Sequence, residues 1–242
     1  MFTRQRIPFD LLRRENLKRL GQGSLACFFL QGAGWAFAGR RDFNLAGKDE
    51  LFIAVPCEIQ IEQGPKASMQ VAAPDEVLEA LRLTSSGRVA RLDTAKGFTT
   101  KQRIVVQVEM PGLVRLETSS AVSAIFGHWK TDKLALVLDG SGKARFNDLS
   151  ARTIQVVLRG ASSMVGSGDV TTQIYSIDGA GSIDARRLIG QSVKVSITGS
   201  GDAVVSAKKD LQVDIAGVGN VQYVGQPLIK RQINGVGSVE PL

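Results

Sequence analysis

The chain has 242 residues, of which 43% are hydrophobic and 22% charged, so it is neither disordered nor collagen-like and can bury one substantial core. Glycine occurs 26 times while aromatic residues make up only 6%, a balance that favours many short strands and tight turns over packed helices. Residues 1–38 contribute +4 to the net charge of +7, which leaves +3 for the rest of the chain. Because phosphate binding needs clustered basic residues, we expect no nucleic-acid partner.

The first 38 residues have the layout of a secretory signal peptide. A basic stretch is followed by an uncharged, mostly apolar run, Leu25–Ala38, that ends in small-x-small at Ala36-Phe37-Ala38. We expect cleavage after Ala38 and export to the periplasm, the outer surface or the medium. A membrane anchor or an ordinary N-terminal helix remains open as an alternative, and an uncleaved leader is the only membrane contact we expect.

Residues 39–133 are rich in strands but irregular, and they are expected to form the first rungs and a cap of a stacked fold. Short segments such as Glu58–Glu62 and Ile104–Val108 alternate apolar and polar residues, as half-buried strands do. Residues 74–81 predict a short helix opened by a proline and acids, and Ser85-Ser-Gly87 predicts a hairpin turn. Cys57 lies in one of the strand segments and is interpreted as a small buried residue.

From about residue 134 the chain repeats itself with a period of 18 to 20 residues. Each repeat has an alternating strand, a Gly-x-Gly motif and a second strand, and the first glycines are Gly140, Gly160 (where the motif is degenerate), Gly179, Gly199, Gly217 and Gly235. Apolar residues stand two and four residues before and four residues after each glycine, with Arg231 as the exception four residues before Gly235; Arg231 and Ile233 are expected to point inward like their counterparts. The pattern predicts that these positions point inward and that neighbouring repeats stack.

The repeat glycines are interpreted as structural, because the chain must turn sharply or approach the next rung closely at these points. They are Gly140, Gly142, Gly160, Gly179, Gly181, Gly199, Gly201, Gly217, Gly219, Gly235 and Gly237. The predicted fold is all-β, a right-handed β-helix or β-solenoid-like stack with glycine-marked repeats of about 19 residues. Residues 39–242 would form one continuous domain, irregular over 39–133 and regular over 134–242.

From about Asp42 onward the chain resembles the putative auto-transporter adhesin, head GIN domain family. The resemblance rests on Phe43, Ile61–Gly64, Val106–Leu113, Gly166–Asp169, Gly199–Asp202 and Asp214–Pro227. It implies a β-solenoid exported to the bacterial envelope and a role in adhesion, and it defines no catalytic residue. The chain departs from the family pattern at Gly160–Ser162 and Gly217–Gly219.

The motifs that suggest a bound ligand lack residues that the ligand would need. Asp139–Ala144 contains Gly-Lys but has alanine where a phosphate loop needs Ser or Thr, and the Gly-x-Gly copies lack the third glycine of a dinucleotide motif. Only one of six repeats has an acid after its second glycine, which is too few for a calcium ladder. We therefore expect no cofactor, no metal and no catalytic residue.

The sequence thus predicts an exported, non-catalytic envelope protein that binds a glycan or a surface protein. The weak binding candidates are His128, Trp129 and Tyr223, although a tryptophan beside a loop histidine is more often part of a core edge. The main alternative is a polysaccharide-processing enzyme using Asp184, Asp202 or Asp214, and a scaffold without a ligand is a third hypothesis. Oligomeric state is not readable from the sequence.

Overall fold

The computed structural model describes residues 39–242, and every structural statement below concerns that part of the chain. The expected leader, residues 1–38, lies outside it. The elements in chain order are β1 (Gly39–Asn44), β2 (Glu50–Ile53), β3 (Cys57–Gln63), β4 (Ser68–Ala73), α1 (Asp75–Ala80), β5 (Leu81–Ser86), β6 (Val89–Thr94), β7 (Val105–Met110), β8 (Arg115–Thr118), β9 (Val122–Leu138), β10 (Lys143–Leu158), β11 (Ser163–Ile177), β12 (Ala180–Ile197), β13 (Ser200–Ile215), β14 (Val218–Val224), β15 (Leu228–Ile233) and β16 (Val236–Pro241).

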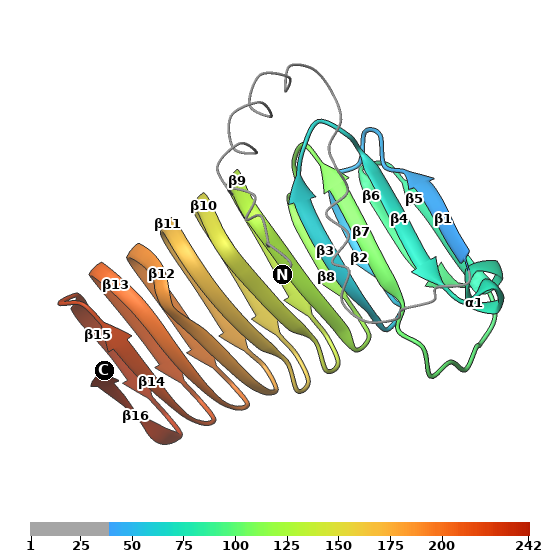
Figure 1. Cartoon of the computed structure of the whole chain (residues 1–242). Helices are drawn as coiled ribbons and strands as arrows, with labels where there is room; N and C mark the ends of the chain where they lie inside the picture. Colours follow the sequence, from blue (N-terminus) through green and yellow to red (C-terminus); the bar gives the residue numbers. More distant parts are fainter. Residues whose placement is uncertain (1–38) are drawn as a thin grey trace, which may run out of the picture. The chain divides into compact units, whose positions relative to one another are not determined.

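The strands stack in parallel coils that form a β-solenoid of about six turns, which confirms the predicted fold class (Figure 1). Each rung has a first wall, which follows a glycine corner, and a second wall, which leads to the next corner. In the first wall the order is β1-β4-β7-β3-β9, continuing through β10, β11, β12 and β13 to β14 and β16. In the second wall β6, β2, β8 and β9 are neighbours, and β15 pairs with β13 at the far end.

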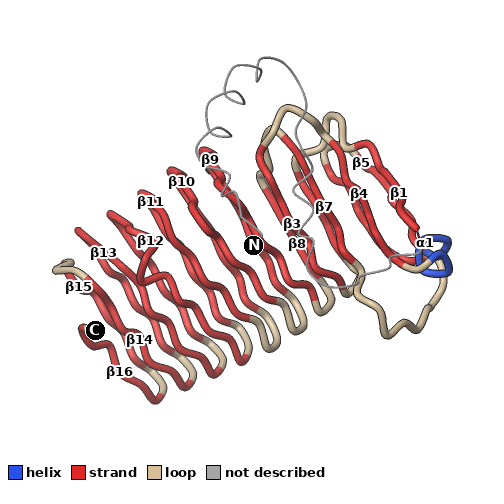
Figure 2. Tube along the Cα trace, viewed as in Figure 1, coloured by secondary structure: helices blue, strands red, loops and turns tan. Residues whose placement is uncertain are grey.

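Successive rungs pair in register, so residues one repeat apart lie directly above one another. Ala144 pairs with Met164, and the same column continues through Ile183, Ala203, Val221 and Val239. Between the two walls the long strands bend, and the pairs from β10 to β13 have register irregularities there, for example between Phe146 and Leu149 in β10. The corners with their glycines therefore form one edge of the stack and these bends form the other (Figure 2).

The core is the space between the two walls. The residues two before each repeat glycine, from Leu138 to Ile215, are at most 1% exposed, as are most of those in the other two predicted inward columns. Phe126 and Phe146 stack across adjacent rungs with centroids 4.4 Å apart, and Trp129 packs edge-on against Phe126 at 5.9 Å. The alternating pattern of the repeats thus identified the inward face of the walls.

Two inward assignments were wrong, both in β15. Ile233 is 36% exposed and Arg231 is exposed, whereas their counterparts in earlier rungs are buried. The physical reason is that β15 has β13 as its one described strand partner, so one side of it remains uncovered. Alternation alone could not show this, because burial also depends on the neighbouring rung.

A buried polar pair interrupts the aliphatic core beside the bend. Gln173 is fully buried; its side-chain amide donates to the backbone oxygen of Leu188 at 2.9 Å, and its own oxygen accepts a hydrogen bond from the Tyr175 hydroxyl at 2.9 Å. Burial raises the pKa of Tyr175. Gly190 leaves room for this amide, since a Cβ there would meet Gln173 Nε2 at 2.8 Å. The side-chain amide of Gln173 and the hydroxyl of Tyr175 both have hydrogen-bond partners, so the pair is compatible with a closed core.

The first rungs are not stacked in the order in which the chain makes them. β3 lies between β7 and β9 in the first wall, and β2 lies between β6 and β8 in the second. The rung made of β2 and β3 is therefore inserted between the β6–β7 rung and the β8–β9 rung, although it precedes both in sequence. Antiparallel partners β1, β4 and β5 and the short helix α1 complete this end, with the β5–β6 turn at Gly87.

The glycine corners depend on how closely the rungs approach one another. At Gly199, Gly217 and Gly235 a Cβ would overlap with the carbonyl oxygen of the preceding corner glycine. Only Gly140 and Gly160 among the repeat corners have positive φ, at 96° and 73°. The first corners thus need glycine for backbone conformation, and most later ones need it because a neighbouring backbone occupies the space.

Replacing Gly217 by alanine tests this explanation. The added methyl group would press on backbone rather than on a movable side chain, so we expect the free energy of unfolding to fall by about 2–4 kcal/mol in urea denaturation. The matched control is Gly112→Ala, because nothing lies within 4 Å of a Cβ at that position. Equal stabilities of the two variants would contradict the close-approach explanation.

Candidate functional site

A hollow lies on the edge of the stack formed by the corners. Its volume is about 720 Å³, and it is lined by residues from four consecutive corners in space: 98–100 with 102–104, 56–58, 121–123, and Ser141 with Lys143. Consecutive strands are about 4.8 Å apart, so the hollow extends about 14 Å along the stack. We call it the corner groove.

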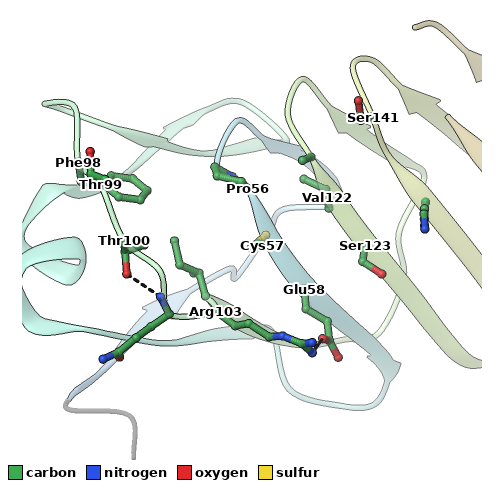
Figure 3. Close-up of a pocket in the computed structure, with 14 residues that line it drawn as sticks. Pro56, Cys57, Glu58, Phe98, Thr99, Thr100, Arg103, Val122, Ser123 and Ser141 are labelled. Atoms are coloured by element: carbon green, nitrogen blue, oxygen red, sulfur yellow. Dashed lines mark hydrogen bonds and ion pairs between the residues drawn. The ribbon is translucent and has the colours of Figure 1, made fainter. Parts of the chain in front are cut away.

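One side of the corner groove is formed by an enlarged corner. The connection between β6 and β7 spans residues 95–104, whereas the corresponding connection between β2 and β3 has only residues 54–56. Figure 3 shows Phe98 and Thr100 on this connection, across from Pro56 and Val122. Gln102 donates its backbone N–H to the Thr100 hydroxyl at 3.0 Å, which shapes the connection locally.

The groove combines an apolar floor with a polar rim. Cys57, Ile104 and Val122 are buried, and Phe98 is half-buried and packed against the core. Hydroxyl and amide groups are supplied by Thr99, Thr100, Gln102, Ser123 and Ser141. Such a mixture suits a ligand with hydroxyl groups and apolar faces, since rims of this kind fix orientation by hydrogen bonding.

Charged groups stand at both ends of the groove. Arg103 forms an ion pair with Glu58, with Nη1 3.6 Å from Oε2. Glu58, Ser123 and Lys143 occupy the same outward column on three neighbouring strands, so Lys143 stands two rungs from the ion pair. Both cations line the groove.

Cys57 lies in the floor of the groove and is not activated. It is 7% exposed, and burial together with the charge of Glu58 raises the pKa of its thiol to about 12. A nucleophilic cysteine needs the opposite shift, toward the thiolate. Its contribution to the site is therefore apolar packing.

The three residues singled out from the sequence lie away from the corner groove. His128 is exposed on β9, and its Nδ1 lies 2.7 Å from Asp148 Oδ2. Trp129, the next residue, points into the core and is fully buried, so the two do not form a joint surface. Tyr223 is half-buried on β14. None of the three lines the corner groove.

The aspartates considered for catalysis each have a different partner. Asp184 pairs with Arg186 at 2.8 Å, and Asp202 accepts the backbone N–H of Asn220 at 2.9 Å. Asp214 lies in the second wall, where it accepts a hydrogen bond from Gln212 at 3.0 Å. Over residues 39–242 no group of three or more His, Cys, Asp and Glu residues is placed to hold a metal ion.

A second hollow of about 560 Å³ continues along the same edge over the next four corners. It is lined by small residues, with Asp202 as its one charged side chain, and no aromatic residue reaches it. The aromatic and cationic groups are thus concentrated in the corner groove.

The sequence reasoning missed the corner groove, although one signal was present. Residues 95–104 lie between two alternating strands and contain no alternation of their own. A ten-residue connection at a point where other rungs turn in two to four residues marks an insertion, and insertions in repeat folds often form binding surfaces.

Comparison with known proteins shows which family the chain belongs to. The family model described as "Putative auto-transporter adhesin, head GIN domain" matches residues 49–227. The chain belongs to this family. No curated protein matches it. No helix in residues 39–242 has the length and apolar character needed to span a membrane.

Several solved structures share the fold of this GIN-domain chain. A putative adhesin from Bacteroides fragilis superposes with a TM-score of 0.78 at 20% identity, and a putative adhesin from Parabacteroides distasonis with 0.62 at 20%. A structure named as a putative lipid binding protein, also from Parabacteroides distasonis, gives 0.68 at 18%. Each comparison covers 84% of this chain and 96% of the other. At these identities the likeness concerns the fold.

The buried thiol gives the GIN-domain chain a testable pH dependence. Because the folded pKa of Cys57 is raised from 9.0 to about 12, the neutral thiol contributes stability that is complete below pH 9 and is lost as the pH rises toward 12. In a Cys27→Ala background, the Cys57→Ala variant should lose less stability than its parent between about pH 8 and about pH 11. Urea denaturation at both pH values measures this, and equal losses would show that Cys57 ionises normally.

Proposed function

We propose that this protein is an exported, non-catalytic binding protein of the bacterial envelope and that the corner groove holds its ligand. The observation that carries the proposal is the enlarged corner, residues 95–104, which converts a flat repeating edge into a hollow with an aromatic side chain and hydroxyl groups. Its rim can hydrogen-bond several neighbouring hydroxyl groups at once, as a glycan presents them.

The family supports a binding role, since its description names an adhesin and two of the similar structures are named as putative adhesins. A third is named as a putative lipid binding protein. The corner groove is open and its rim is polar, which suits a hydroxylated ligand better than an acyl chain.

Binding without turnover is the expected result on a glycan array followed by incubation with the bound glycans. Phe98→Ala should reduce binding about tenfold, because the ring supplies the apolar face of the groove. The matched control is Phe43→Ala, which removes another half-buried phenylalanine that packs on the core but does not line the groove.

Thermal melting of both phenylalanine variants separates lost packing from lost binding. If the two variants bind equally, the groove is not the ligand site. Turnover of a bound glycan that disappears when Asp184, Asp202 or Asp214 is changed to asparagine would replace the proposal by the enzymatic alternative.

Export through a cleaved leader is part of the proposal. The apolar run that ends at Ala38 in small-x-small supports it. N-terminal sequencing of protein recovered from the envelope or periplasmic fraction should therefore begin at Gly39. Recovery of the uncleaved chain in the membrane fraction would indicate an anchor instead.

A further inference from the structure

Positive charge is concentrated on the enlarged corner. Residues 95–104 contain Lys96, Lys101 and Arg103 and no acidic residue, so this segment carries +3. The whole of residues 39–242 also carries +3, since Lys and Arg elsewhere are balanced by Asp and Glu. The charge of this one connection therefore equals the entire net charge of residues 39–242.

The charge lies where a bound ligand would meet it. Arg103 lines the corner groove from one end and Lys143 from the other, about two strand spacings away from Glu58. Glu58 is the one acid lining the groove, and it is engaged by Arg103. The lining thus carries two cations against one anion, and Lys96 and Lys101 add to the field from the same connection.

Glu58 also restricts where the guanidinium can lie. Arg103 stays positively charged in its ion pair with Glu58, because a guanidinium does not lose its proton in proteins. Held in this way, it loses less freedom when it binds an anionic group than an unrestrained surface arginine would.

The groove also has a direction. Its four lining segments belong to four neighbouring rungs, so a ligand that contacts all of them runs along the stack rather than around one coil. Arg103 and Lys143 stand at different rungs of that path. A chain with anionic groups on more than one unit would contact both cations.

We infer that the ligand of the corner groove is a linear acidic glycan, bound along the stack with its anionic groups at Arg103 and Lys143. This inference rests on the proposed binding function and narrows its ligand class. The hydroxyl and amide groups of the rim contact sugar hydroxyls, Phe98 packs against an apolar sugar face, and the two cations select carboxylate, sulfate or phosphate substituents.

The test is a glycan array that carries neutral, carboxylated, sulfated and phosphorylated glycans, followed by calorimetry with tetragalacturonate and its methyl ester. Acidic glycans should give the signals, and the acid should bind at least about tenfold more tightly than the ester. Higher ionic strength should weaken the binding of the acid and leave any binding of the ester unchanged.

Substitutions of single charged residues show which side chains bind the acidic glycan. Lys143→Gln and Arg103→Gln should each weaken binding of the acidic glycan about fivefold to tenfold without changing the melting temperature, and Lys143→Arg should retain it. Lys208→Gln is the matched control, because Lys208 is exposed on β13 and does not line the groove.

The outcomes separate this inference from the proposed function. Binding confined to neutral glycans, or loss of affinity in Lys208→Gln equal to that in Lys143→Gln, overturns the acidic-ligand inference and leaves the binding function standing. An array without any signal overturns both. Binding to anionic lipid vesicles or to a protein, with no glycan bound, also overturns the inference.

Discussion

The close approach of neighbouring corners is the constraint on which the rest of the molecule depends. The carbonyl oxygen of one corner glycine occupies the space that a side chain on the next would need, from Gly160 through Gly235. This spacing keeps both walls in continuous parallel register and aligns the inward residues into columns. A wider separation at the corners would disturb the hydrogen-bonded ladders and open the core between them. The glycines therefore act on stability through backbone packing.

The corner groove exists because one rung departs from that rule. Between β6 and β7 the chain makes a connection of ten residues, whereas the other rungs turn in two to four residues. The same departure brings Phe98 and Arg103 to an edge otherwise lined mostly by small residues. In this fold, an insertion at one corner is compatible with a fixed set of walls, because connecting segments at the surface tolerate insertions. The walls are thus determined by packing, and ligand recognition can be located at the edge.

Much of the fold could be predicted from the sequence, and the reason is the repetition. The column that contains Leu138, Leu158 and Ile177 shows the same inward position in successive repeats. A misleading residue in one repeat therefore has little effect on the prediction. The pattern failed at Arg231 and Ile233, because burial of a rung requires a neighbour that local sequence does not reveal. It could not show that β2 and β3 sit between later strands, since strand order depends on long-range pairing. The groove was missed for a related reason: Pro56, Phe98 and Ser141 are distant in sequence, and only the stacking of corners brings them together.

The inserted rung of β2 and β3 has a consequence for how the chain can fold. Both of its lateral neighbours, β6–β7 on one side and β8–β9 on the other, are made later in the chain. Strands β10 to β16 can be added one after another as they emerge, because each pairs with a rung already present. Residues 50–63 stay unpaired on one edge until residues 89–110 are available and on the other edge until residues 115–126 are available. The slow, non-local step of folding therefore belongs to the front of the molecule, where strand edges stay exposed longest.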